Sequence, residues 1–531
     1  MTRFKKWINK IGIVEIIFLF TIILGFLFRL SYYSNDPKYI YEGDYNRDYL
    51  VAHHMLKYHE VPLKGPDGGL GVVSSPLYYY LLYLALLVND SLLTLGIFNI
   101  FLQIGSILLV YLLCLQVFSK STAFIASFLF NFQNNLIEQS QFVWQPAIMQ
   151  PFNILAYFLA ILSYEKKSFK LLVGSIIAFN IALSIHYSLI GILPLYFFII
   201  FLIVYRVFKY KKYYLIIFVA TFLSLVLTHI PLLILWWGNI TGFFTEASYY
   251  IPRPDFTYIL DNFVSRTKIF FGYFFDTQSK QMSMFLFFSY SVLVIHYFID
   301  KCVDLKRKSV AKIIFSGMGL FLLITSLKPD IGFGIPFPTR YFAPIFIPLI
   351  ILIAEVTNPF RKDILVTKVL KIITLTFTVN IFLSKIPDLY RQTRLRFPTN
   401  IVRPEMTAIK GEIEAIKQNE NKSDYSFFIF KVYKYIYERG ISEDLYQSEI
   451  FWVGAEKVLD ARLTYVDDLE MRGWKPNASD EYIFLVCPKL ENDTDSNSDC
   501  FSSFLKDHAK YNKVKTVALS NLNSIYLFKR K

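Results

Sequence analysis

Cysteine and charged residues are both scarce in this chain. Its 531 residues include four cysteines, and Asp, Glu, Lys and Arg together make up 18% of the sequence. The cysteines, which are Cys114, Cys302, Cys487 and Cys500, lack the paired CxxC spacing of a structural zinc site. So little charge, together with 54% hydrophobic residues and a mean hydropathy of +0.41, excludes a single soluble domain and indicates a polytopic membrane protein.

Two further motifs are incomplete. The glycines of GPDGGLGV are not followed by the GK[ST] of a nucleotide-binding loop, so they indicate a tight turn instead. The acidic stretch ENDTDSNSDC lacks the glycine and the terminal glutamate of an EF-hand loop. We interpret it as a solvated loop and not as a calcium site.

The net charge of +14 does not come from one basic patch. Lysines and arginines lie in short clusters between apolar runs, as topology signals do, so we exclude nucleic acid as a partner. The first ten residues are basic, and the apolar run Ile11–Leu30 is long enough to span a membrane and has no small-residue cleavage site. We therefore expect an uncleaved first helix with a cytoplasmic N-terminus.

The apolar pattern predicts an all-α polytopic bundle with about eleven spans in the cytoplasmic membrane. The basic turns EKKSFK, KYKK and DKCVDLKRKS alternate with loops poor in Lys and Arg, as the positive-inside rule requires. An odd number of spans that starts inside places the C-terminal segment outside. The predicted spans are residues 11–30, 92–118, 122–136, 147–164, 170–187, 189–207, 213–237, 282–299, 310–327, 341–356 and 364–384.

Two segments outside these spans have a predicted structure of their own. Pro76–Val88 is aromatic and apolar but too short to cross, so we expect a helix at the outer interface. Gly238–Gln281 is predicted as a long outer loop, whose YYIPRPDF stretch is too rich in proline for a helix.

We predict two domains. Residues 1–384 form the membrane domain, with the first outer loop over 31–91, and residues 385–531 form an extracytoplasmic domain. In the second, PEMTAIKGEIEAIKQ has the pattern of an amphipathic helix, while DYSFFIFKV, DEYIFLVCP and NSIYLFKRK have that of short buried strands. A small α/β domain fits this pattern. If it lies outside, Cys487 and Cys500 could form a disulfide.

The first outer loop contains carboxylates, imidazoles and glycines directly after the first span. Asp44 and Asp48 are four residues apart, so they share one face if the segment is helical, with Arg47 beside them. Catalysis at the bilayer surface and a solvated turn of mixed charge are both compatible with this pattern.

Four separated stretches, taken together, resemble bacterial membrane glycosyltransferases of the C-type (GT-C) fold, the superfamily of protein O-mannosyltransferases and of the aminoarabinose transferases that act on lipid A. The resemblance covers most of the first 350 or so residues in order, whereas each motif alone is weak. The stretches are GDYNRD with KGPDGGLGVVSSPLYYYLL, SQFVWQPAIMQPF, ALSIHYSLIGILPL and PTRYFAPIFIPLI.

The resemblance implies an inverting glycosyltransferase with a polyprenyl-phosphate sugar donor of the undecaprenyl or dolichyl type. Its acceptor would be a lipid, a glycan or a protein at the outer face of the cytoplasmic membrane. Such a reaction needs a base for the acceptor hydroxyl and cations for the departing phosphate. The resemblance assigns the base to Asp44, with Asp48 as the second choice; a supporting role for Asp48 beside Arg47 remains open.

Arginines near the outer ends of the spans are candidates for the donor phosphate. Arg340 begins the TRYFAPIFIP stretch, where its guanidinium could bind a lipid phosphate and Tyr341 could anchor the helix at the headgroups. Ordinary snorkelling of an arginine at a span end is the alternative. Arg253, in YYIPRPDF, is a weaker candidate for the same role.

The remaining candidates concern the acceptor or a metal ion. Glu138 lies in the second outer turn, where related enzymes carry an acidic residue that helps to bind a divalent metal, such as Mg²⁺ or Mn²⁺, or the acceptor. His53 and His54 point to different helix faces, so at most one of them would join Asp44 in such a site. His186 either orients the active-site loop or is a hydrogen-bonded core histidine.

Two rival functions remain. The first is a polymerase or ligase that moves a larger lipid-linked glycan, and the second is a transporter or flippase for lipid-linked glycans. The polar residues gather in outer loops and not on broken helices at mid-membrane, and the chain has no repeated halves, which argues against transport.

Overall fold

The computed structural model places most of the N-terminal three quarters of the chain and the strands of the C-terminal part. The chain divides into two compact units, one formed by Met1–Pro37 with Val51–Arg396 and the other by Lys38–Leu50 with Phe397–Lys531. Residues that the structure describes are 12–33, 43–68, 72–141, 143–208, 211–236, 256–275, 280–300, 303–326, 342–361, 363–384, 415, 426–431, 462–467, 482–488, 511–519 and 523–530.

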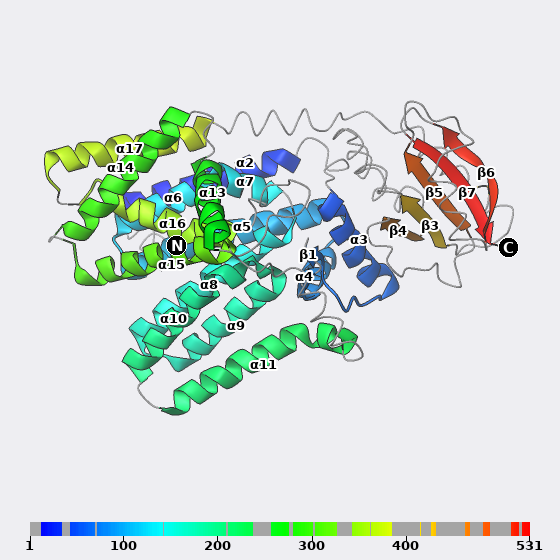
Figure 1. Cartoon of the computed structure of the whole chain (residues 1–531), viewed down its shortest axis with the longest axis horizontal. Helices are drawn as coiled ribbons and strands as arrows, with labels where there is room; N and C mark the ends of the chain where they lie inside the picture. Colours follow the sequence, from blue (N-terminus) through cyan, green and yellow to red (C-terminus); the bar gives the residue numbers. More distant parts are fainter. Residues whose placement is uncertain are drawn as a thin grey trace, which may run out of the picture. The chain divides into compact units, whose positions relative to one another are not determined.

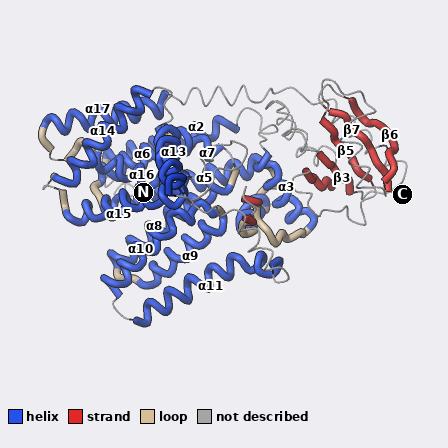
Figure 2. The backbone as a smooth tube through the Cα atoms, viewed as in Figure 1, coloured by secondary structure: helices blue, strands red, loops and turns tan. Residues whose placement is uncertain are grey.

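The first unit is built from helices, drawn in blue in Figure 2. With the short strands of one hairpin, the elements follow in the order α2 (Ile13–Tyr33), α3 (Gly43–Tyr58), β1 (Asp67–Gly68), β2 (Val72–Val73), α4 (Leu77–Leu86), α5 (Leu92–Val117), α6 (Lys120–Phe132), α7 (Asn134–Gln141), α8 (Gln145–Lys166), α9 (Phe169–Ile185), η2 (Tyr187–Ile192), α10 (Leu193–Ile203), η3 (Val204–Phe208), α11 (Lys211–Trp236), α13 (Phe256–Phe275), α14 (Lys280–Ile299), α15 (Leu305–Ser326), α16 (Ala343–Val356) and α17 (Leu365–Ser384), most of which are labelled in Figure 1. The first half of α3, residues 43–50, belongs to the second unit.

Apart from the stretch over 122–136, each apolar stretch that we predict as a span coincides with a helix, or with the continuous run of η2, α10 and η3. By length and apolarity together, four helical stretches in the described part of the chain could cross a membrane. These are Leu92–Val117, Gln145–Lys166, Tyr187–Phe208 and Leu365–Ser384. The fold is therefore that of a mostly helical membrane protein, while the number of spans stays a prediction.

One predicted span is wrong at its C-terminal end. We expect a single helix over 122–136, but α6 ends at Phe132 and α7 begins at Asn134. The Gln133 side chain explains the break, because its Oε1 accepts a hydrogen bond from the Leu136 backbone N–H at 2.8 Å. Its Nε2 donates to the Phe274 carbonyl at 3.0 Å, which joins this corner to α13.

The long loop predicted over 238–281 contains a helix, α13 (Phe256–Phe275), that we did not predict. The helix is amphipathic and buries aromatic rings on one face. The Phe270 ring centroid lies 5.3 Å from that of Phe342 and 6.1 Å from that of Phe346, at the start of α16. Phe274 packs against Phe346 at 5.5 Å, so this aromatic cluster holds α13 against the bundle.

Ion pairs collect at one end of the bundle, which we call the basic end. Glu15 at the start of α2 pairs with Lys120 at the start of α6. Glu165 at the end of α8 pairs with Lys306 at the start of α15. The second pair joins two of the basic turns, EKKSFK and DKCVDLKRKS, that the positive-inside rule assigns to the same side of the membrane.

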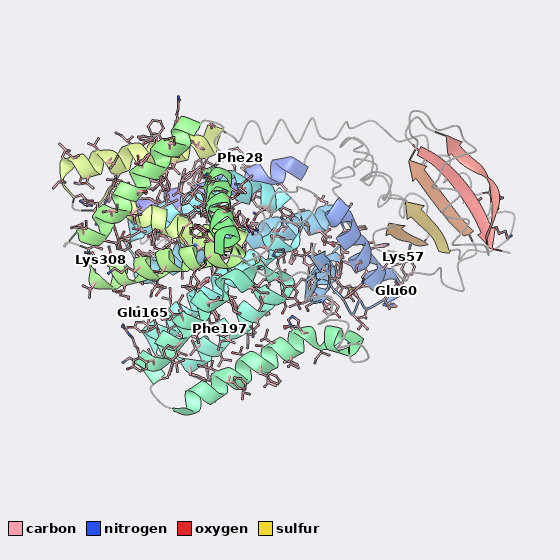
Figure 3. All side chains as sticks on the ribbon, in the orientation of Figure 1. Phe28, Lys57, Glu60, Glu165, Phe197 and Lys308 are labelled. Carbon is pink, nitrogen blue, oxygen red and sulfur yellow. The ribbon has the colours of Figure 1, made fainter. Side chains whose placement is uncertain are left out.

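The opposite end, which we call the loop end, is made by the C-terminal half of α3, the β1–β2 hairpin, α4, α7 and η2. Figure 3 labels Lys57 and Glu60 at this end, and Glu165 and Lys308 at the basic end. The segments that carry the resemblance to GT-C enzymes, where the structure describes them in this unit, lie largely at the loop end.

The C-terminal unit contains a mixed five-stranded sheet of order β4-β3-β5-β7-β6. The strands are β3 (Ser426–Lys431), β4 (Arg462–Asp467), β5 (Tyr482–Pro488), β6 (Tyr511–Leu519) and β7 (Asn523–Arg530). β3 pairs in parallel with β4 and β5, whereas β7 pairs antiparallel with β5 and β6. The three strands that we predict are confirmed as β3, β5 and β7.

Two predictions for this unit lie outside the described residues. The amphipathic helix over 404–418 is described only at Ala415, and Cys500, the predicted partner of Cys487, is not among the described residues. The α/β character of the unit, the disulfide and the division at 384 and 385 stay predictions.

Candidate functional site

The helix α3 contains both catalytic candidates. Because it runs from Gly43 to Tyr58, Asp44 and Asp48 are one helical turn apart, as the sequence predicts. Asp48 is buried, with 1% of its surface exposed. A carboxylate that is this well buried must be held by hydrogen bonds or a counter-charge, so its position is fixed by its surroundings.

The two adjacent histidines of α3 face different partners, as we expect from their positions on a helix. His53 is buried, and its Nδ1 lies 2.9 Å from Asp90 Oδ2, which fixes the ring against the turn after α4. His54 Nδ1 lies 3.6 Å from Glu60 Oε2, and its ring meets that of Tyr58 edge-on at 5.3 Å. His54 is the one of the pair that keeps partial exposure.

The glycine-rich stretch folds as a hairpin and not as a nucleotide-binding loop. The Gly65 N–H donates to the Ser74 carbonyl at 2.8 Å, and the Ser74 N–H donates to Pro66 at 3.3 Å. A Cβ at Gly65 would lie 2.2 Å from the Ser75 carbonyl oxygen, so a residue without a side chain is required there. The predicted tight turn itself, over residues 69–71, lies outside the described residues and stays a prediction.

The helix α4 holds the hairpin and the turn after α7. The Tyr80 hydroxyl donates to the Pro62 carbonyl at 2.9 Å, and the Tyr78 hydroxyl donates to the Val143 carbonyl at 3.1 Å. Burial raises the pKa of Tyr80, so its phenol stays protonated and remains a donor.

Buried amides fix α7, the helix that carries Glu138. Asn99 of α5 donates to the carbonyls of Gln139 and Ser140 at 3.2 and 3.0 Å. Gln150 of α8 donates to the Gln139 side chain at 2.7 Å. All three amide side chains are at most 1% exposed, so α7 is clamped to its neighbours by hydrogen bonds in an apolar setting.

His186 caps a break between two helices at the loop end. It follows the last residue of α9, and its Nδ1 accepts from the Ser188 N–H at 3.3 Å, which starts the 3₁₀ helix η2. The same nitrogen lies 2.7 Å from Ser188 Oγ. Next to it, the Tyr187 hydroxyl lies 3.3 Å from His229 Nε2 on α11.

An arginine that we did not predict lies buried near the C-terminal end of α2. Arg29 is 1% exposed and donates to the Gly25 carbonyl at 3.0 Å, to Asn131 Oδ1 at 2.9 Å and to the Asn131 carbonyl at 3.0 Å. Asn131 in turn donates to the Thr21 carbonyl at 2.7 Å. These bonds join α2, which leads into the first outer loop, to α6, which leads into α7.

Substituting Ala for Gly25 is expected to lower stability by about 1–3 kcal/mol through overpacking. A Cβ there would lie 2.0 Å from Asn131 Oδ1, and Asn131 cannot move away without losing its bonds to Arg29. Gly105→Ala in α5 is the matched control, because a Cβ there meets nothing within 4 Å. Thermal unfolding of the purified proteins in detergent measures the difference. Equal unfolding temperatures for the two variants would contradict the clamp.

Among the described residues, one group of acidic and histidine side chains has the spacing of a metal site. The ligand atoms of His296, Asp300 and Asp363 all lie within 4.8 Å of one another. However, Arg361 lies 2.8 Å from Asp300, and Lys371 lies 2.7 Å from Asp363. The two carboxylates are thus already neutralised by cations, and the group lies at the basic end.

The structure does not test several candidate residues. Arg253, Arg340 and Tyr341 lie outside the described residues, and for Asp44 and Glu138 the structure describes the backbone but not the side chain. The roles of these five residues therefore stay predictions. Of the other candidates, His54 and His186 lie at the loop end.

Sequence reasoning missed Arg29, Asn131 and His229. An arginine inside an apolar run is itself a signal, because a charge within a membrane span is costly unless it has partners or a function. Its partner Asn131 is 102 residues away, and no local pattern connects the two.

Comparison with solved structures identifies the fold. ArnT from Cupriavidus metallidurans in the apo state is similar to this chain with a TM-score of 0.56 and 10% identity, over 97% of each chain. The same enzyme bound to undecaprenyl phosphate gives a TM-score of 0.54 and 9% identity, again over 97% of each chain. The oligosaccharyltransferase AglB from Archaeoglobus fulgidus, with an inhibitory peptide and a dolichol-phosphate, gives 0.45 and 12% identity, over 88% of this chain and 69% of that one.

No protein-family model and no curated protein matches the sequence. The identities of 9–10% with ArnT are too low to carry over an activity, but the match extends along nearly the whole of both chains. The predicted resemblance in fold is confirmed: this chain has the GT-C fold of the membrane glycosyltransferase ArnT.

Proposed function

We propose that the chain is an inverting membrane glycosyltransferase that moves a sugar from a polyprenyl-phosphate donor to a lipid, glycan or protein acceptor. The observation that carries the proposal is the likeness to ArnT over 97% of both chains, because that structure was solved with undecaprenyl phosphate bound. The reaction would take place at the outer face of the cytoplasmic membrane, with the N-terminus inside and the C-terminal unit outside.

In the proposed mechanism, Asp44 accepts the proton of the acceptor hydroxyl as its oxygen attacks the anomeric carbon. The bond between that carbon and the phosphate oxygen breaks, and the polyprenyl phosphate leaves with the electron pair. Arg340, with Arg253 as a second candidate, would meet the charge of the leaving phosphate, and Tyr341 would anchor the helix at the interface. Asp48, which is buried, would hold the loop.

A divalent metal ion such as Mg²⁺ or Mn²⁺ also belongs to the proposal. The carboxylates of Asp44 and Glu138 are the hard oxygen ligands that these ions prefer, and His54 is an imidazole of the kind that Mn²⁺ accepts. When bound, the ion would supply positive charge to the phosphate. The group at the basic end is a weaker candidate for the ion, because its carboxylates are paired with Arg361 and Lys371.

The decisive experiment is incubation of the purified full-length protein in detergent with a panel of polyprenyl-phosphate sugars. We expect one donor to be consumed, by transfer when an acceptor extract is present and by slow hydrolysis without it. The matched control is Tyr205→Ala, since Tyr205 is 63% exposed on η3, at the basic end. Failure to consume any donor, by a protein that unfolds cooperatively, would refute the proposal.

The proposed orientation has its own test. An alkaline phosphatase fused after Lys531 is expected to be active, because an odd number of spans that starts inside puts the C-terminal unit outside. The control is the same enzyme fused within the basic turn at Lys306, where it should be inactive. If the fusion after Lys531 is inactive while a cytoplasmic reporter works there, the span count is wrong by one.

A further inference from the structure

A group of lysines at the basic end has no role in the proposed reaction. It comes from two segments, the turn between α8 and α9 and the first turns of α15. Residues 163–170 and 303–312 together contain seven lysines and arginines but only two acidic residues. One of these acids, Glu165, pairs with Lys306 and so joins the two segments. Figure 3 labels Glu165 and Lys308, one on each segment.

Five lysines flank this ion pair, and we call them the lysine cluster. They are Lys166, Lys167, Lys170, Lys308 and Lys312. Four of them are exposed, and Lys308 is half-buried. None of the five forms an ion pair with another residue that the structure describes. Like charges on two adjoining segments repel one another, so an anion that binds between them relieves an unfavourable interaction.

The turn between α8 and α9 is held in one conformation. The Ser163 hydroxyl donates to the Ser168 carbonyl at 2.9 Å, and the Ser168 N–H donates to the Ser163 carbonyl at 3.1 Å. The Phe169 ring meets that of Phe208 edge-on at 5.4 Å, which packs the start of α9 against η3. Lys167 ends α8 with a φ of 52°, in the left-handed region where glycine is usual. A fixed backbone of this kind lowers the entropic cost of binding a ligand.

The cluster lies at a membrane boundary. The helix α8, which ends at Lys166, is one of the stretches long and apolar enough to cross a membrane. Exposed apolar side chains adjoin the cluster: Tyr164 on α8 is 39% exposed, and Phe315, one turn beyond Lys312 on α15, is 53% exposed. A ligand that contacts both kinds of surface needs an anionic group and apolar chains.

We propose that the lysine cluster binds the phosphodiester headgroup of an anionic phospholipid in the leaflet that the basic end faces. Ammonium groups attract the negative phosphodiester, whereas a zwitterionic headgroup also carries a cation, which the lysines repel. Basic sites between the ends of membrane helices bind lipid headgroups in this way. The inference goes beyond the proposed function, since neither the sugar donor nor Asp44 takes part in it.

The test is native mass spectrometry of the purified full-length protein in detergent. The protein is titrated with phosphatidylglycerol or with phosphatidylcholine that has the same acyl chains, so that only the headgroup differs. We expect the wild-type protein to bind phosphatidylglycerol about tenfold more tightly or better. Lys308→Gln combined with Lys312→Gln should remove most of this preference, because each lysine near an anionic headgroup contributes about fivefold to binding.

Three further variants separate the cluster from a general effect of charge. Lys167→Gly should fold, because glycine adopts the left-handed backbone readily, and should bind phosphatidylglycerol about fivefold more weakly. Glu165→Gln should bind it more tightly, because the variant loses a repelling carboxylate and frees Lys306. Lys57→Gln combined with Lys64→Gln removes two exposed lysines at the loop end, and this matched control should bind as the wild type does.

Equal binding of the two lipids by the wild-type protein would overturn the inference. So would equal losses in the loop-end control and in the cluster variants, because net charge alone would then set the binding. Displacement of phosphatidylglycerol by excess glycerophosphoglycerol, the same headgroup without acyl chains, would overturn the assignment to a lipid. A protein that binds phosphatidylglycerol through the lysine cluster but consumes no sugar donor would refute the proposed function alone.

Discussion

Asn in place of Asp44 is expected to leave the protein folded and able to bind its donor but unable to transfer the sugar. Asn keeps the shape of the side chain but cannot accept the proton of the acceptor hydroxyl. General-base catalysis contributes about a hundred- to ten-thousand-fold to the rate, and loss of a metal ligand would add to the effect. Single-turnover transfer with the natural donor measures it, and thermal unfolding excludes a folding defect.

Asp48→Asn is the matched control for this prediction. It lies one turn away on α3, is buried, and should lose stability more than chemistry if it only supports the loop. Near-normal transfer by Asp44→Asn with near-total loss in Asp48→Asn would move the base to Asp48. Survival of transfer in both variants would remove α3 from the chemistry.

The apolar helices could be predicted from sequence because about twenty apolar residues in a row have one stable solution in a bilayer, a helix. What the sequence did not reveal is where polar side chains interrupt that pattern. Gln133 ends α6 early because its side chain caps α7, and α13 was missed because its apolar residues occupy only one face. Such a face is recognised only once its partners on α16 are known.

The five-stranded sheet of the C-terminal unit shows the same limit of prediction from sequence. The predicted strands β3, β5 and β7 occupy the three central positions of the sheet, and each contains an apolar run. The missed strands, β4 and β6, are the two edges. β6 carries Lys513 and Lys515 and shifts register twice against β7, and charges and bulges of this kind are how edge strands avoid pairing with other chains. The charges and bulges that protect an edge strand also interrupt its apolar pattern, so such a strand is harder to predict from the sequence.

For the candidate site, spacing along one helix was predictable and contact across the fold was not. The interval between Asp44 and Asp48 gave their common face correctly, since it depends only on helical geometry. The Arg29–Asn131 clamp and the contact between the Tyr187 hydroxyl and His229 Nε2 join residues that are far apart in the chain. The hydrogen-bond partners of these side chains come close to them only in the folded bundle.

Asn in place of Asp363 is expected to destabilise the membrane unit by about 3–5 kcal/mol. The Asp363 side chain is fully buried, that of Lys371 is 2% exposed, and the two meet at 2.7 Å at the basic end. Removing the carboxylate leaves the Lys371 ammonium buried without its counter-ion, and the cost of that uncompensated charge exceeds what the pair itself contributes. Thermal unfolding in detergent should show a large fall in midpoint.

The chain offers a control at the same end of the bundle. Glu165→Gln breaks the Glu165–Lys306 pair, whose side chains are 35% and 48% exposed, and should cost less than about 1 kcal/mol because water screens both charges. A double variant, Asp363→Asn with Lys371→Met, should regain much of the stability, since no buried charge is then left unpaired. Equal losses of stability in Asp363→Asn and Glu165→Gln would contradict this prediction. They would mean that water reaches the Asp363–Lys371 pair and screens its charges as it does for the exposed pair.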